Sequence, residues 1–176
     1  MSKVLILIAV FLTSLIAGYF VFFNTSGSNM NTPSGQEQNQ VIQPSLSPGE
    51  VEIEASFAIF TNGTLRVFTE NKYHNRSQDV FISSENPNII QVKKPGTTWG
   101  YFFSTLPMTL SSECLTTGTQ QTFCTGSSGT LQFYINGEQN DAALDQEIKD
   151  GDQLLVSFGS ESMEIIKSQL EQIPIP

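Results

Sequence analysis

Apolar and polar residues alternate along several short segments of this chain, the pattern of β-strands with one buried face. The first segment, residues 51–60, reads "VEIEASFAIF" and sets apolar residues at odd positions, from Val51 to Ile59, against glutamates and a serine. Asn-Gly follows at residues 62–63, and strand character resumes in "LRVF". Both turn residues tolerate the positive φ of a tight turn, so a hairpin is predicted.

A second hairpin is predicted from "DVFIS" at residues 79–83 and "NIIQVKK" at residues 88–94. The segment between the two hairpins, residues 70–78, reads "ENKYHNRSQ" and is predicted to be a surface loop. Its His74 is interpreted as a solvated loop residue.

One helix is predicted inside the domain, in "PGTTWGYFFSTLP" at residues 95–107. Its apolar residues recur at i, i+3, i+4 and i+7, which places them on a single face: Trp99, Phe102, Phe103 and Leu106. Thr97 or Thr98 can cap its start, and Pro107 ends it. Such an aromatic stripe is interpreted as core packing.

The remaining segments predict three strands and a helix. A short strand is expected near Met108 and Leu110, followed by a strand in "TLQFYINGE", residues 130–138. The phrase "DGDQLLVSFG", residues 150–159, predicts a tight turn and a strand that points Leu154, Val156 and Phe158 to the core and Leu155 to the other face. Residues 160–173, "SESMEIIKSQLEQI", predict a last helix that begins at Ser160. The residues expected on its buried face are Met163, Ile166, Leu170 and Ile173.

The N-terminus carries an uncharged apolar run, residues 4–23. At about 1.5 Å per residue this run spans roughly 30 Å, the hydrocarbon thickness of a bilayer, and it is longer than the apolar region of a cleaved signal peptide, which is the alternative. Lys3 precedes it and no basic residue follows before Arg66, so the C-terminal part is expected outside the cytoplasm of a single-pass cell-membrane protein. We therefore predict a transmembrane signal-anchor at residues 1–23, a disordered polar tether at residues 24–50 and an extracytoplasmic domain at residues 51–176.

The exported part is acidic. Beyond residue 23, 7 basic side chains are present against 17 acidic ones. Such a surface repels nucleic acid, so no nucleic-acid partner is predicted.

Two cysteines, Cys114 and Cys124, lie in the polar segment "SSECLTTGTQQTFC". Outside the cytoplasm an even number of cysteines predicts a structural disulfide. A redox-active pair is the alternative, but such pairs typically have a CxxC spacing.

The order of elements resembles the β-grasp fold of ubiquitin-like sulfur carriers over about residues 51–159. The resemblance is carried by "LQFYINGE" and "DGDQLLVSFG" and implies an α+β fold with a mixed sheet wrapped on one helix. A further C-terminal helix and the N-terminal transmembrane helix complete the expected architecture. A sulfur carrier needs a Gly-Gly carboxyl terminus, whereas "GSESMEIIKSQLEQIPIP" follows here, so that activity is not expected. The anchor, the tether, the cysteine pair and "IKDGDQLLVSFGS" also resemble a set of membrane-anchored microbial proteins of unknown function.

Other chemistry is sparse. With one histidine and two cysteines expected to pair, no catalytic constellation, metal site or cofactor is predicted. Three N-x-Ser/Thr sequons, at Asn24, Asn62 and Asn75, are possible glycosylation sites.

These observations favour a membrane-anchored extracytoplasmic module that binds an unknown protein or small-molecule ligand. The alternative is an extracytoplasmic redox accessory or enzyme that uses Cys114 and Cys124.

Overall fold

The computed structural model describes residues 49–176. The predicted anchor at residues 4–23, nearly all of the tether and Asn24 lie outside the described residues. Between residues 49 and 176, no helix is long and apolar enough to cross a bilayer.

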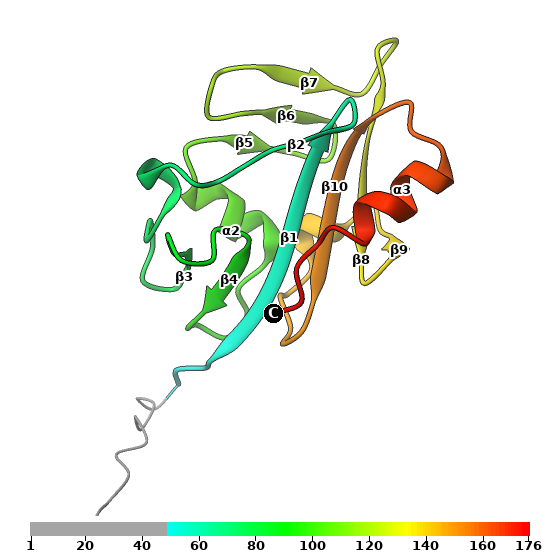
Figure 1. Ribbon diagram of the computed structural model, residues 1–176. Coiled ribbons are helices and arrows are strands. Elements are labelled where there is room, and N and C mark those ends of the chain that lie inside the picture. The colour runs from blue at the N-terminus through cyan, green and yellow to red at the C-terminus, as the bar shows by residue number, and fades with distance from the viewer. Residues whose placement is uncertain (1–48) are drawn as a thin grey trace, which may run out of the picture. The chain divides into compact units, whose positions relative to one another are not determined.

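A parallel pair of strands forms the centre of the main sheet (Figure 1). These strands are β1 (Ile53–Thr61) and β10 (Gln153–Gly159), with Phe57 opposite Leu154 and Ile59 opposite Val156. All other pairings in this sheet are antiparallel. The order is β3-β4-β1-β10-β8-β9, where β3 is Val80–Ile82, β4 Ile89–Val92, β8 Thr130–Ile135 and β9 Glu138–Gln139. The short β2 (Thr64–Leu65) pairs with the end of β1.

The predicted hairpins are confirmed, although the strand predicted in "LRVF" is confined to Thr64–Leu65. Asn62 and Gly63 turn β1 into β2 with φ values of 49° and 72°, and Asn136 and Gly137 turn β8 into β9 with 53° and 84°. Asn and Gly are the residues that adopt positive φ most readily, so each Asn-Gly pair sets its turn locally. The second hairpin, β3 with β4, is also present.

The helix α2 (Trp99–Thr105) covers one face of the sheet, as predicted. The Thr98 hydroxyl accepts a hydrogen bond from Tyr101 N at 3.2 Å and caps its start. Trp99 and Phe103 are at most 1 % exposed, and the Phe103 ring lies edge-on to Phe57 of β1 at 5.7 Å. The aromatic stripe is therefore core.

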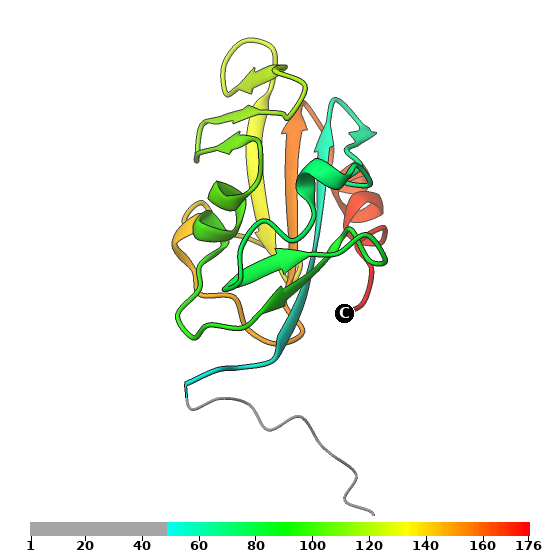
Figure 2. The same cartoon turned by 90° about the vertical axis from the view of Figure 1, so that its left-hand side faces the viewer.

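A second, three-stranded sheet extends the same layer (Figure 2). Its strands are β5 (Thr109–Leu110), β6 (Cys114–Thr116) and β7 (Thr122–Cys124). Leu115 of β6 is fully buried in the main core. The predicted short strand near Leu110 is confirmed.

The helix α3 (Met163–Leu170) covers the opposite face of the main sheet (Figure 2). Ile166 and Ile173 pack with Tyr134 and with Leu155, which points to this second face as predicted. The predicted start at Ser160 was wrong: Ser162 caps the helix, because its side chain is the one that accepts from Ile165 N. Met163, which was expected on the buried face, is consequently in the first turn and is 71 % exposed.

The two layers also change the expected pattern of β1. Ser56, Ala58 and Phe60 are buried as well as Phe57 and Ile59. Because α3 covers the face that alternation assigned to solvent, the strand is buried on both sides over this stretch. The coarse α+β class, with a mixed sheet and two helices, is confirmed.

Candidate functional site

A cleft of about 180 Å³ lies between the segment that follows β2 and the β6–β7 hairpin. Its floor consists of core side chains, among them Ile59, Phe68 and Leu115. Its rim carries Arg66, Glu70, Thr117 and Thr119. Leu65 and Val67, which also line it, are 39 % and 66 % exposed. The cleft thus combines an apolar floor with a polar rim, the composition typical of ligand sites.

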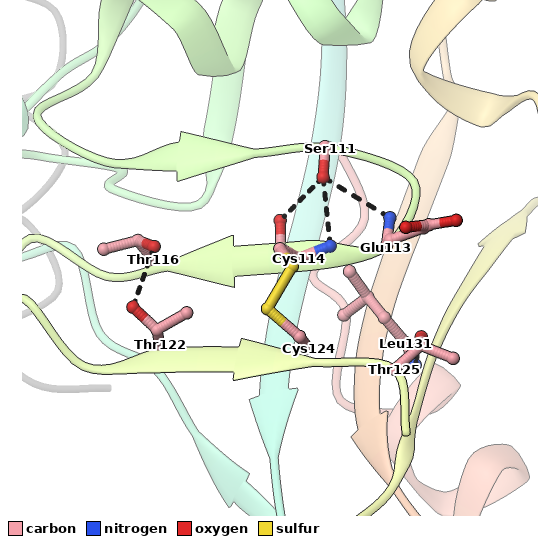
Figure 3. The surroundings of a disulfide bond; sticks show 8 residues. All are labelled: Ser111, Glu113, Cys114, Thr116, Thr122, Cys124, Thr125 and Leu131. Carbon is pink, nitrogen blue, oxygen red and sulfur yellow. Dashed lines mark hydrogen bonds between the residues drawn. A yellow bond between two sulfur atoms is a disulfide. The ribbon is translucent and has the colours of Figure 1, made fainter.

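The disulfide fixes one wall of this cleft (Figure 3). Cys114 and Cys124 are directly opposite each other on β6 and β7 and are bonded, which confirms the predicted pair. The Ser111 hydroxyl accepts a hydrogen bond from Cys114 N at 3.0 Å and holds the turn before β6. At the far end of the hairpin, Thr116 and Thr122 share a hydrogen bond between their hydroxyls at 3.0 Å. The cysteines therefore belong to a paired β-hairpin.

Arg66 connects this hairpin to the segment after β2. Its guanidinium lies 5.1 Å from the centre of the Phe123 ring, a cation–π contact. Its Nε donates to the Thr61 hydroxyl at 2.6 Å, and its Nη1 donates to Gln121 Oε1 at 3.4 Å. Phe123 itself packs on Phe158 of β10 at 5.4 Å. Arg66 thereby sets the spacing between the two walls.

The second wall of the cleft, residues 65–73, is buried more deeply than the sequence indicated. Tyr73, at the end of the short 3-10 helix η1 (Asn71–Tyr73), packs against Phe68 with ring centres 5.1 Å apart. Gly118 of the facing hairpin has room for no side chain, because a Cβ there would collide with the Tyr73 hydroxyl and lie 3.0 Å from Pro107 O. The two walls therefore touch at one end of the cleft.

His74 was wrongly predicted to be solvated. The side chain is only 9 % exposed, and its Nε2 is 2.8 Å from Phe68 O. Since a carbonyl only accepts, Nε2 carries the proton, and Nδ1 is buried without a partner among the described residues. His74 is therefore a support for the second wall: it orders the chain that carries Phe68 and Tyr73.

The aspartates of the "DGD" turn accept hydrogen bonds from neighbouring strands and turns. Gly151 has a φ of 80°. Asp150 Oδ1 accepts from Glu54 N at 3.0 Å, whereas Asp152 accepts from Lys149 N and from Asn136 Nδ2, both at 2.9 Å. The turn is thus tied to β1 and to the β8–β9 turn as well as to the Lys149 amide.

Within residues 49–176, no three His, Cys, Asp or Glu side chains gather in a way that could hold a metal ion.

Asn62 and Asn75 are both exposed, each at a positive φ, so the two sequons in the described part of the chain face solvent. The polar segment before β10 contributes to the core through Ala143, in the short 3-10 helix η2 (Ala143–Asp145), and through Ile148.

No family model, curated protein or solved structure matches this chain. Sequence reasoning missed the cleft, because its walls come from segments about 50 residues apart that only the sheet brings together. The available signal was "TLRVF", in which Leu65 and Val67 alternate with Arg66, and of which only Thr64 and Leu65 pair with β1.

Proposed function

We propose that this chain is a membrane-anchored extracytoplasmic module that binds a ligand or a partner side chain in the cleft between the β2 segment and the disulfide hairpin. The observation that carries the proposal is the cleft itself, with its apolar floor and the exposed Leu65 and Val67 at its edge. The disulfide stabilises the hairpin wall, and Arg66 connects the two walls. The site is therefore preorganised, which lowers the entropic cost of binding.

The size of the cleft limits what can enter. An apolar cavity of about 150 Å³ accommodates a benzene ring, so about 180 Å³ suits one phenyl group or one branched aliphatic side chain. At the rim, the Thr117 and Thr119 hydroxyls share a hydrogen bond at 2.9 Å, and Arg66 keeps N–H groups beyond those that bond Thr61 and Gln121 for an oxygen-bearing substituent. The ligand class is therefore a small apolar group with an attached acceptor, either free or as an anchor residue of a protein.

The β-grasp assignment is part of the proposal. Parallel pairing of the first and last long strands, with a helix across one face of the sheet, supports it. The sulfur-carrier role is not proposed, because β10 leads into α3, which packs back on the sheet. Residues 4–23 are proposed as the anchor, with the domain outside the cell, and protease added to intact cells should then remove the domain. Full protection of a tagged domain would contradict this topology.

The binding proposal is tested by NMR titration of the isotopically labelled chain with phenylacetate and with benzyl alcohol. Both carry a phenyl group and an oxygen acceptor, and amide shifts should concentrate in residues 65–73 and 115–119. Replacing both Leu65 and Val67 with Ser should weaken binding, since it removes apolar surface at the mouth without touching the core.

A matched control is Ile175→Ser. Ile175 is 87 % exposed and does not line the cleft, so its loss removes similar apolar surface elsewhere. Equal weakening by the cleft variants and by the control, or shifts scattered over the whole domain, would refute the cleft as the site.

A further inference from the structure

A second apolar surface lies far from the cleft in the fold, where α3 runs beside the β8–β9 hairpin (Figure 1). It is a groove of about 450 Å³. Met163, Ile166 and Leu170 line it from the helix, and Tyr134 and Gly137 line it from the hairpin. Met163 is 71 % exposed, so apolar surface remains open to solvent along this edge of α3.

Tyr134 supplies an independent sign of a ligand. The side chain is 2 % exposed, and its hydroxyl has no hydrogen-bond partner among residues 49–176. A buried hydroxyl without a partner is costly, so evolution toward Phe would be favoured by stability alone. Burial also raises the pKa of Tyr134, which keeps the hydroxyl protonated and able to donate. Met163 at the rim is flexible and can shift to admit an acceptor.

The charges around the groove indicate the sign of the partner. Glu138 follows Gly137, while Glu164 and Glu171 lie on or just after α3, and all three are exposed. Glu164 and Lys167 both line the groove, and Lys167 is the single basic side chain in residues 160–176. No ion pair joins Lys167 to these carboxylates in the described structure. Three carboxylates against one ammonium leave a net negative charge around the groove, which favours basic side chains of a partner. An anionic membrane surface and a second copy of this acidic domain are both repelled by this charge.

We infer that the groove between α3 and the β8–β9 hairpin docks a basic amphipathic segment of a partner protein. The apolar side chains of this segment lie against Met163, Ile166 and Leu170. Its Lys or Arg side chains pair with the glutamates around the groove. One of its oxygen atoms accepts a hydrogen bond from the Tyr134 hydroxyl. Strand addition at this sheet edge is disfavoured, because β9 has only 2 residues and carries Glu138. A helical segment with anchors at i, i+3, i+4 and i+7 fits the groove better.

The probe is a fluorescein-labelled peptide with Leu at those positions and Lys elsewhere, and its counterpart has Glu in place of Lys. Fluorescence anisotropy with the full-length chain in a nonionic detergent should show binding of the Lys peptide and none of the Glu peptide. The pair Glu138→Lys and Glu164→Lys should weaken the Lys peptide about tenfold. Glu85→Lys with Glu113→Lys makes the same change in net charge away from the groove and should change affinity less than about twofold.

Tyr134→Phe separates a binding role from a structural one. It should weaken the Lys peptide about fivefold, by the loss of one hydrogen bond, while the melting temperature stays the same or rises. Four results would overturn the inference: no binding of the Lys peptide, equal weakening by the two lysine pairs, a lower melting temperature of Tyr134→Phe without a change in affinity, or self-association of the chain that Met163→Ser abolishes.

Discussion

The turn around Asp152 offers a sharp test of how this fold is held together. The Asp152 carboxylate accepts one hydrogen bond from Lys149 N and one from Asn136 Nδ2, both at 2.9 Å. Asn136 cannot reverse its amide, because its Oδ1 accepts from Gln153 N at 2.9 Å. The two turns that flank the β8–β10 pair are therefore joined by a network in which each oxygen is assigned.

Asp152→Asn should break this network. The side-chain amide introduced at position 152 has one oxygen, whereas Lys149 N and Asn136 Nδ2 both need an acceptor. One of these two donors must then face the NH₂ group of the new amide. With Asp152 only 8 % exposed, solvent cannot replace the missing acceptor well. A hydrogen bond to a charged group contributes about 1.5–3 kcal/mol, and a loss of about 2 kcal/mol in the free energy of unfolding is expected. Urea unfolding of residues 44–176, followed by intrinsic fluorescence, measures it.

Asp150→Asn is the matched control. Among the described residues, Asp150 accepts only from Glu54 N, in an exposed position, and an Asn oxygen can replace that acceptor. Its cost should stay below about 0.5 kcal/mol. The two aspartates therefore differ in cost, although both belong to the same turn.

The exchange Asn136→Asp with Asp152→Asn supplies a rescue. It keeps the net charge and moves the carboxylate to position 136, where it would accept from Gln153 N and from the new amide at position 152. The oxygen of that amide would in turn accept from Lys149 N. The double variant should lie within about 1 kcal/mol of the original chain, although each single change is costly. Additive losses in the two single variants, or an Asp152→Asn cost as small as that of Asp150→Asn, would refute the network.

Three further changes test other parts of the fold by the same unfolding measurement. Phe103→Ala should cost about 3–5 kcal/mol because the ring is fully buried against the sheet; a cost below about 1 kcal/mol would mean the aromatic face is not core. Gly151→Ala should cost about 1–2 kcal/mol from its φ of 80° alone, since no atom lies within 4 Å of the new Cβ, and a neutral result would deny the strained turn. Gln169→Leu should raise stability by about 1–2 kcal/mol, because this side chain is 2 % exposed and neither amide atom has a partner in the described region; a loss would show that the amide is satisfied in solution.

Local chemistry determined the parts of this protein that the sequence predicted well. The two Asn-Gly turns, the Thr98-capped aromatic helix and the inward side chains of β10 depend on neighbours in the chain, and periodicity reports them directly. The cysteine pair was predictable because only two cysteines are present.

Tertiary structure decided what depends on distant segments. Alternation could not show that α3 covers the second face of β1, because Ala58 occupies a solvent-facing position of the pattern until the helix packs there. Nor could composition show that His74 in a polar segment is buried and bonds Phe68 O. The cleft and the acid-rimmed groove arise in the same way, since each is bounded by segments far apart in the chain. Packing between such segments is the physical property that a linear pattern does not contain.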